Sequence, residues 1–282
     1  MLAVALSLAA SCSWGVADFA GGLFSRRWSS VAVLFVMETA GLLTAAIIVL
    51  ASGDAFPDGR SVVLAFAAGS AGITGLGLFF RALSVGSMSI VAPLASTGAI
   101  VPVAVGIATG DRVTVLIGVG LAIAIAGVAL AGQEGGEEAG GVAGRHAHSV
   151  ALALAAALAF GTFFVAYDSA ADGSAAWATL LARLPAIPLA GGLMLVRRIP
   201  PVRGPDLLKL CVAGQLDCIA TGLYAVAVTR GALSVVAVVG SLYPVATVLL
   251  ARAVLGERLR PLQSAGVVAA LVGVALVSAG SA

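Results

Sequence analysis

The chain has 282 residues, of which 61% are hydrophobic and 10% are charged, and its mean hydropathy is +1.13. A soluble domain is about half apolar and about a quarter charged, so lipid rather than water must cover most of this surface. The net charge of +2 and the pI near 8.6 indicate no concentrated basic face, and nucleic acid is not an expected partner.

Segments long enough to span a membrane follow one another along most of the chain. A spanning helix needs roughly 20 mostly apolar residues, and polar, glycine or proline breaks separate such runs here. The pattern predicts an all-α membrane protein with ten transmembrane helices. The expected spans are 2–24, 31–51, 61–84, 88–109, 113–132, 149–169, 175–196, 206–229, 232–255 and 262–281.

One connection is long, QEGGEEAGGVAGRHAH at residues 133–148, and it is acidic, rich in glycine and without apolar periodicity. These features predict a flexible linker between two domains, residues 1–132 and 149–282. His146 and His148 lie in this linker, where an exposed His-x-His pair is usually incidental rather than a metal site. We therefore expect no bound metal and no cofactor.

The two halves repeat each other at an offset of 145 or 146 residues, and internal repetition has to be tested before any single motif is trusted. Trp14 in the first span falls on Phe160 in the sixth. The loop residues Gly110-Asp111-Arg112 fall on Gly256-Glu257-Arg258. This charged match carries the most weight, because spans rich in alanine, glycine and valine produce chance identities.

Each repeat holds five expected helices, an odd number, so the second copy enters the membrane in the opposite sense from the first. Such an inverted repeat is the architecture of many secondary transporters. A duplicated scaffold without transport is the other interpretation, but inverted symmetry offers a direct route to alternating access. The sequence therefore favours a transporter.

Three motifs resemble the EamA-type transporters of the drug/metabolite transporter superfamily. They are Trp14-Gly15 in the first expected helix, Gly86-x-x-Ser-x-Val-Ala-Pro at the turn into the fourth, and GALSVVAVVGSLYPVATVLLARAVLGERL at residues 231–259. Both five-helix repeats fit in order, so the resemblance covers nearly the whole chain. It implies a ten-helix exporter of small metabolites in a bacterial-type cytoplasmic membrane, with substrates that include amino acids and other small polar or amphipathic compounds.

The sequence departs from the family pattern in the fourth expected helix. The Tyr-Pro pair of the family, present as Tyr243-Pro244 in the ninth helix, is replaced there by Gly98-Ala99, and Pro102 comes later. The two halves of a substrate site are therefore expected to differ.

Proline breaks in the fourth and ninth expected helices predict a cavity wall. Pro93 and Pro102 interrupt the fourth helix and Pro244 the ninth, and broken helices line the midplane sites of many carriers. The other interpretation is that prolines only kink membrane helices while serine and threonine restore the lost hydrogen bonds. The hydroxyl groups expected along this wall belong to Ser96, Thr97, Ser241 and Tyr243.

Glu38 is the only charged residue in the expected span 31–51, and the residue 145 positions later is Arg183. A midplane charge costs roughly 2.5 to 3.5 kcal/mol on insertion scales, so both side chains are expected to face the bundle interior or an interface. One hypothesis places them in the transport path, where they bind the ammonium and carboxylate of a zwitterion or exchange a proton. The other gives them a structural role, as a salt bridge or as side chains that reach toward headgroups. An arginine at this place resembles the family, whereas Glu38 does not.

Asp18 in the first expected helix and Asp217 in the eighth are, with Glu38, the candidates for proton coupling, since a carboxylate at membrane depth can exchange a proton. The alternative for Asp217 is a structural aspartate, and the alternative for Asp18 is a place near a helix end beside Arg26 and Arg27. Tyr224, about two turns after Asp217, and Trp14 are candidates for substrate binding, although an aromatic residue on a membrane helix more often serves packing.

Basic residues gather in the loops after odd-numbered helices, above all Arg197, Arg198, Arg203 and Lys209 after the seventh. The positive-inside rule would place these loops in the cytoplasm and both termini outside. Characterised relatives of the family generally have both termini inside, so the orientation stays open.

The expected function is secondary active export of small metabolites such as amino acids by alternating access, with protons as a candidate coupling ion. The expected partners are the substrate and the lipid bilayer, and a monomer is expected because the duplication supplies both halves. A lipid or lipid-linked sugar flippase and a non-transporting membrane scaffold are the alternatives. An enzyme is not expected, because both histidines lie in the linker and no Gly-x-Ser-x-Gly motif is present.

Overall fold

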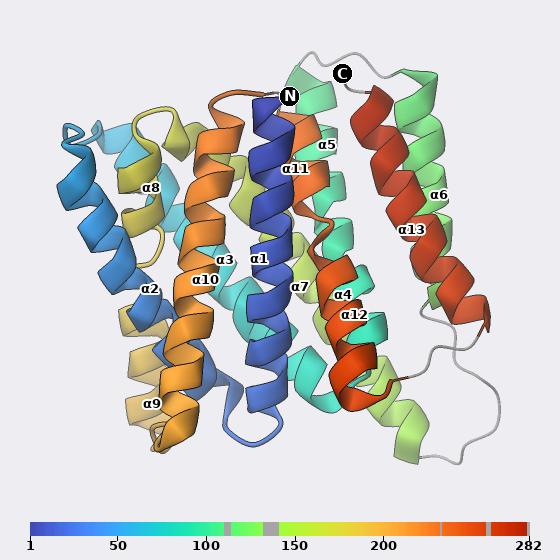
Figure 1. Cartoon of the computed structure of the whole chain (residues 1–282), viewed down its shortest axis with the longest axis horizontal. Coiled ribbons are helices and arrows are strands. Elements are labelled where there is room, and N and C mark those ends of the chain that lie inside the picture. The colour runs from blue at the N-terminus through green and yellow to red at the C-terminus, as the bar shows by residue number, and fades with distance from the viewer. Residues whose placement is uncertain (110–113, 132–140, 232, 258–260, 281–282) are drawn as a thin grey trace.

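The fold is a bundle of helices that run side by side with roughly parallel axes (Figure 1). The computed structural model describes residues 1–109, 114–131, 141–231, 233–257 and 261–280, and every regular element in these residues is helical. The first half contains α1 (Leu2–Ser25), α2 (Ser30–Ser52), α3 (Gly59–Val85), α4 (Met88–Ser96), a 3-10 turn (Thr97–Ala99), α5 (Ile100–Thr109) and α6 (Val115–Ala131). The second half contains α7 (Gly141–Ala171), α8 (Ala175–Leu181), a π-helical turn (Ile187–Gly191), α9 (Gly192–Arg197), α10 (Pro205–Val228), α11 (Leu233–Gly240), α12 (Tyr243–Leu255) and α13 (Pro261–Gly280).

Large apolar side chains cover the outside of the bundle. Leu43 and Ile47 of α2 and Val63 of α3 are 65%, 67% and 67% exposed. A contiguous surface of this kind is unfavourable in water, and the hydrocarbon chains of a bilayer are its natural solvent. The helical runs that are long and apolar enough to cross a membrane are α1, α2, α3, Met88–Gly106, Ala147–Ala171 and α10.

The start of the second half differs from the sequence expectation. The predicted linker covers residues 133–148, but α7 begins at Gly141, because residues 141–148 continue the helix that the apolar run after Ser149 sustains. Residues 133–140 of that linker lie outside the described residues. His148 is exposed on α7.

The expected spans 88–109 and 232–255 are both broken near their middles. In the first, the break is the 3-10 turn at Thr97–Ala99, which lies between Pro93 inside α4 and Pro102 in the first turn of α5. In the second, α12 begins immediately before Pro244, whose missing N–H costs nothing in a first helical turn. The prolines therefore mark the breaks, as the sequence predicts.

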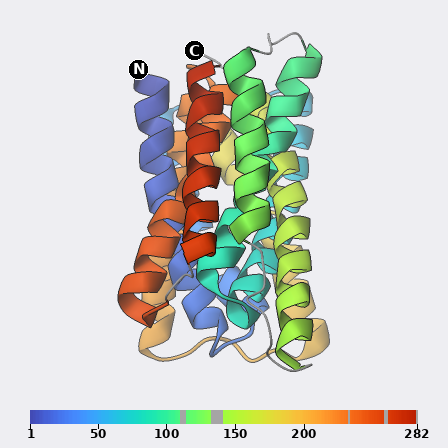
Figure 2. The same cartoon turned by 90° about the vertical axis from the view of Figure 1, so that its right-hand side faces the viewer.

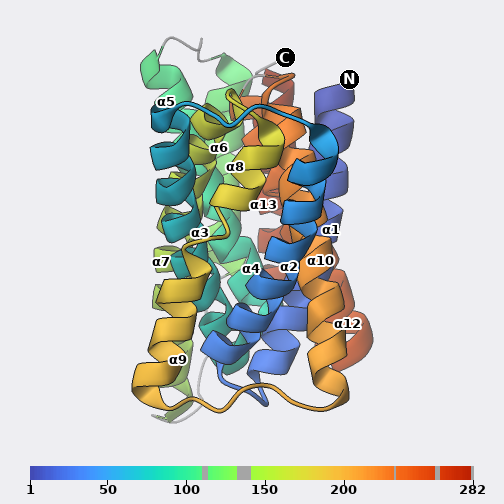
Figure 3. The same cartoon turned by 90° about the vertical axis from the view of Figure 1, so that its left-hand side faces the viewer.

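A third break, which the sequence analysis did not anticipate, divides the expected span 175–196. After α8 the chain makes tight turns, in which Arg183 N–H donates to the carbonyl of Leu180 and Ala186 N–H donates to that of Arg183. Pro185 has no N–H for an α-helical bond, so the helix cannot continue through it. Figure 3 shows α8 and α9 separated by this irregular segment.

The two halves are related by an inverted pseudo-twofold axis that is visible in matching contacts. A Cβ atom on Gly69 would overlap the carbonyl of Ala182, and one on Gly214 would overlap the carbonyl of Met37. Gly214 and Ala182 stand 145 positions after Gly69 and Met37, so this is one backbone contact made twice. Small residues permit such close approach between membrane helices.

The directions of the helices agree with this symmetry. The chain starts α1 at one face of the bundle and α7 at the opposite face, and both termini lie at the same face (Figure 1). The last helices of the two halves, α6 and α13, pack against each other (Figure 2).

Glu257, in the loop after α12, closes the bundle at the face opposite the termini. Its carboxylate accepts hydrogen bonds from the N–H of Ser89 (3.0 Å) and of Met88 (3.3 Å) and from the hydroxyls of Ser89 (2.8 Å) and Ser87 (3.0 Å). Arg26, after α1, pairs with it at 3.2 Å. A residue of the second half therefore satisfies the free N–H groups at the start of α4 in the first half, where the helix dipole also favours negative charge. Its counterpart in the repeat, Asp111, lies outside the described residues.

The Glu257→Gln substitution is expected to lower the free energy of unfolding by roughly 2 kcal/mol at pH 7, because the charged acceptor of several hydrogen bonds is replaced by a neutral amide. Burial raises the pKa of Glu257, but the hydrogen bonds from Ser89, Ser87 and Met88 outweigh it and leave the pKa below its ordinary value. The stabilisation is therefore complete above the ordinary glutamate pKa of about 4.3 and is lost as the pH falls through the lower folded-state pKa.

Thermal unfolding of the purified protein in lipid nanodiscs, recorded from pH 3 to pH 8, measures this effect. The matched control is Asp58→Asn, which removes an exposed carboxylate that caps α3 through Ser61 N–H (2.9 Å). A variant at Glu257 that unfolds like the Asp58 control at neutral pH would contradict the proposed cap.

Candidate functional site

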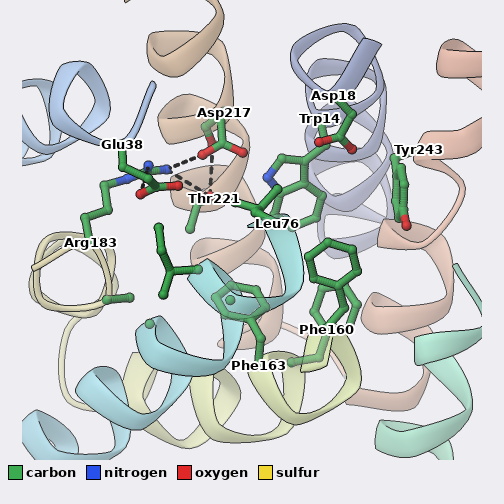
Figure 4. Close-up of a pocket in the computed structure, with 15 residues that line it drawn as sticks. Trp14, Asp18, Glu38, Leu76, Phe160, Phe163, Arg183, Asp217, Thr221 and Tyr243 are labelled. Atoms are coloured by element: carbon green, nitrogen blue, oxygen red, sulfur yellow. Dashed lines mark hydrogen bonds and ion pairs between the residues drawn. The ribbon is translucent and has the colours of Figure 1, made fainter. Parts of the chain in front are cut away.

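An internal cavity of about 80 Å³ lies in the middle of the bundle between the two halves (Figure 4). On the same measure one water needs roughly 10–15 Å³, so the space suits a small organic molecule. Its walls come from α1, α2, α3, α7, α10, α12 and the irregular segment after α8. The lining residues are Trp14, Asp18, Glu38, Gly69, Gly72, Ile73, Leu76, Phe160, Phe163, Phe164, Ala182, Arg183, Asp217, Thr221 and Tyr243.

Arg183 is the centre of a buried ionic cluster at one end of the cavity. Its Nη1 donates to Glu38 at 3.0 Å, and its Nη2 donates to Asp217 at 2.7 Å and to the hydroxyl of Thr221 at 3.2 Å. The three charged residues are only 4–6% exposed. A charge at this depth is tolerated when it is paired and hydrogen-bonded, and each charge here has such a partner.

The local sequence explains how the guanidinium reaches its partners. The break after α8 places Arg183 in a turn instead of a regular helix, and it lies between α2 and α10. Gly41 of α2 leaves room for the side chain, because a Cβ atom there would lie 2.6 Å from Arg183 Nη1. Glu38 stands one turn before Gly41 on the same helix, so one face of α2 supplies both the space and the countercharge.

Aromatic rings form the remainder of the wall. Trp14 of α1 lies 6.1 Å from Phe164 of α7, and Phe160 lies 6.5 Å from Tyr243 of α12, measured between ring centroids. Asp18 follows Trp14 by four residues and therefore lies on the same face of α1. In Figure 4 Trp14 stands between the ionic cluster and the end of the cavity that holds Asp18 and Tyr243.

The cavity lies on the pseudo-twofold axis, because its lining consists largely of repeat-related pairs. Glu38 and Arg183 contact each other directly although they occupy equivalent positions of the two halves, which requires both to lie beside the axis. The other pairs in the lining are Trp14 with Phe160, Asp18 with Phe164, Gly72 with Asp217 and Leu76 with Thr221. In each of the pairs that include Asp18, Asp217 or Thr221, a polar residue in one half corresponds to an apolar residue in the other, so the two halves of the cavity differ in polarity.

The structure places six of the predicted site residues around the cavity: Trp14, Asp18, Glu38, Arg183, Asp217 and Tyr243. Tyr224 lies directly behind the wall, 5.4 Å from Trp14 between ring centroids. Pro93, Ser96, Thr97, Ser241 and Pro244 are not among the described lining residues. The hydroxyls of Ser96 and Thr97 donate to the carbonyls of Pro93 and Leu94 one turn back.

The cavity-lining residues of α3 and α7 were not among those predicted from the sequence. Gly69, Gly72, Ile73 and Leu76 form one face of α3 at helical spacing, but this apolar face carries no chemical signal that separates it from ordinary packing. Phe160 had a usable signal, since it is the repeat counterpart of Trp14.

The described residues contain no group of three or more histidine, cysteine, aspartate or glutamate side chains that could hold a metal ion. The residues that line the cavity carry carboxylates, but Arg183 lies among two of them, and a nearby cation disfavours metal binding.

The fold and the cavity define a multi-pass membrane protein built from an inverted repeat. Residues 1–133 and 148–279 match the sequence profile of the EamA-like transporter family, and the protein belongs to this family, within the drug/metabolite transporter superfamily. Among curated proteins no match is found. A crystal structure of a protein with 17% sequence identity superposes with a TM-score of 0.74 over 98% of this chain and 96% of its own, a likeness that shows the fold alone. The family resemblance of the sequence motifs is thereby confirmed.

The Arg183→Gln substitution is expected to lower the free energy of unfolding by about 3–5 kcal/mol, because it leaves Glu38 and Asp217 buried without a countercharge. The triple variant Glu38→Gln, Arg183→Met, Asp217→Asn removes all three charges and is expected to recover most of that loss. Thermal unfolding in nanodiscs compares the two. Equal loss in both variants would show that packing volume, rather than charge pairing, is what Arg183 provides.

Proposed function

We propose that this protein is a secondary active transporter that exports small metabolites, such as amino acids, across the cytoplasmic membrane by alternating access. Membership of the EamA-like family supports transport as the class of function. The observation that carries the proposal is the cavity on the pseudo-twofold axis, which has charged groups at one end and aromatic walls. Small-molecule sites have this composition, mostly apolar with a few fixed polar groups.

Alternating access follows from the position of the cavity between two inverted halves. We infer ten membrane crossings, with the broken paths α4–α5, α8–α9 and α11–α12 each counted as one. The broken segments supply flexible points near the midplane, as in other carriers with discontinuous helices. The contact of Glu257 with the start of α4 holds one face closed in this conformation. One copy of the chain supplies both halves, so we propose a monomer.

Proton coupling is assigned to the carboxylates that line the cavity, Asp18, Glu38 and Asp217. A proton taken up by Glu38 or Asp217 would weaken its ion pair with Arg183, so proton binding and helix packing are linked at this cluster. Asp18 has no such partner and can change its protonation without breaking an ion pair.

The Leu76→Trp substitution tests whether the cavity is the transport path. The larger side chain fills the space between α3 and α7 and is expected to reduce transport at least tenfold while the protein still folds. Val63→Trp is the matched control, because Val63 lies on the same helix but is 67% exposed toward lipid. The measurement is accumulation of a pool of labelled amino acids and other small metabolites in proteoliposomes under an imposed pH gradient.

Three outcomes of this experiment are informative. Transport by the wild type and by Val63→Trp, but not by Leu76→Trp, supports the carrier and its path. Equal transport by all three proteins keeps the carrier but rejects the cavity as the path. Absence of transport by the folded wild type across the whole pool, with or without the gradient, would count against the proposed metabolite carrier.

A further inference from the structure

Among the described lining residues, Asp18 is the one carboxylate without a hydrogen bond or ion pair to another described residue. It is 6% exposed, and it makes no hydrogen bond or ion pair with any described residue. Its own helix provides no partner, because the residues three and four positions away on α1 are Trp14, Gly15, Gly21 and Gly22, none of which carries a charge. A buried carboxylate without a partner is costly, so its presence at a cavity points to a partner that arrives from outside the protein.

The positive charge in the cavity lining is already paired with other carboxylates. Arg183 is the only cationic side chain among the described lining residues. Its Nη1 donates to Glu38 and its Nη2 donates to Asp217. The cluster has two carboxylates for one guanidinium, so it carries no surplus positive charge for a ligand. With Asp18 included, carboxyl groups outnumber cationic side chains among the described lining residues by three to one.

The surroundings of Asp18 suit an organic cation rather than a metal ion. Trp14 lies on the same face of α1, and Phe164 lies 6.1 Å from it between ring centroids. Figure 4 places Asp18 beside Trp14 and at the same end of the cavity as Tyr243. The Tyr243 hydroxyl is buried without a hydrogen-bond partner. Aromatic faces attract ammonium groups and contact the apolar body of a ligand, whereas a metal ion needs several oxygen ligands.

We propose that the cavity binds small organic amines, with the ammonium group at Asp18 and the apolar body against Trp14, Phe160 and Phe164. This inference rests on the proposed transport function and, among the small metabolites named there, selects amines without a carboxylate as the substrate class in place of amino acids. An amino acid would bring a carboxylate into a lining whose one cation is already paired with two acids. A neutral alcohol of the same shape would leave Asp18 unpaired.

Four probes that share a phenyl ring on a short chain separate these cases: phenethylamine, L-phenylalanine, 3-phenylpropionate and 2-phenylethanol. Isothermal titration of the wild-type protein in nanodiscs at pH 7 measures their binding. Phenethylamine is expected to bind at least tenfold more tightly than each of the other three. Equal or tighter binding of L-phenylalanine or 3-phenylpropionate would overturn the proposal, and so would the absence of binding by all four probes.

Substitutions at Asp18 test which group holds the ammonium. Asp18→Asn keeps the shape and is expected to weaken phenethylamine binding at least tenfold, whereas Asp18→Glu keeps the charge and retains most of the binding. Asp168→Asn is the matched control, because Asp168 is a partly buried carboxylate of α7 that does not line the cavity. Each variant is first compared with the wild type in thermal unfolding. If Asp18→Asn folds and binds phenethylamine like the wild type, the assignment is wrong.

Proteoliposome transport of the same probes distinguishes this inference from the proposed function. If phenethylamine binds at Asp18 but no probe or metabolite is carried, the amine site stands and the carrier is rejected. If labelled metabolites are carried while phenethylamine does not bind, the carrier stands and the amine site is rejected.

Discussion

The ion pairs of Arg183 with Glu38 and Asp217 are the constraint on which the centre of the structure depends. Each of these three buried charges is costly without its partner, so the ion pairs hold α2, the segment after α8, and α10 together at one point. The helix break at Pro185 lets the chain turn at Arg183, and the absence of a side chain at Gly41 leaves room for the guanidinium. The cavity is the space that remains beside the cluster, and aromatic rings form much of the rest of its wall.

The cluster also explains why the two halves do not behave as equal copies. The duplicated sequence provides equivalent positions, but Glu38 and Arg183 carry opposite charges at one such pair, and Asp217 corresponds to Gly72 at another. The backbone contacts of Gly69 and Gly214 remain symmetric, because close helix packing depends on size and not on charge. The backbone packing of the two halves is therefore symmetric, whereas the polar side chains of the cavity are not.

Much of this arrangement could be predicted from the sequence, and the reason is the offset of 145 residues. This offset places Glu38 and Arg183 at equivalent positions, and together with the composition it predicts the helical membrane fold and the two repeats. Proline positions marked two of the three broken paths, but the break at Pro185 was missed, because the surrounding residues are apolar enough to continue a helix. The face of α3 that lines the cavity was also missed, since glycine, isoleucine and leucine there look like ordinary packing. The predicted wall around Ser96 and Thr97 relied on hydroxyl groups, and in the structure these groups bond to the preceding turn of their own helix.

The place of Glu38 and Arg183 on the symmetry axis has one more consequence. In the alternating-access cycle that we propose, the two inverted halves trade conformations, and each contact becomes the contact between the repeat counterparts of its residues. The Glu38–Arg183 pair turns into itself, so this salt bridge is compatible with both end states and can act as a fixed pivot. The Arg183–Asp217 pair turns into a pairing of Glu38 with Gly72, which has no side chain, so that bond belongs to one end state alone. In this proposed cycle the guanidinium of Arg183 makes one ion pair that is kept in both end states and one that exists in a single end state, and the second pair would stabilise that state relative to the other.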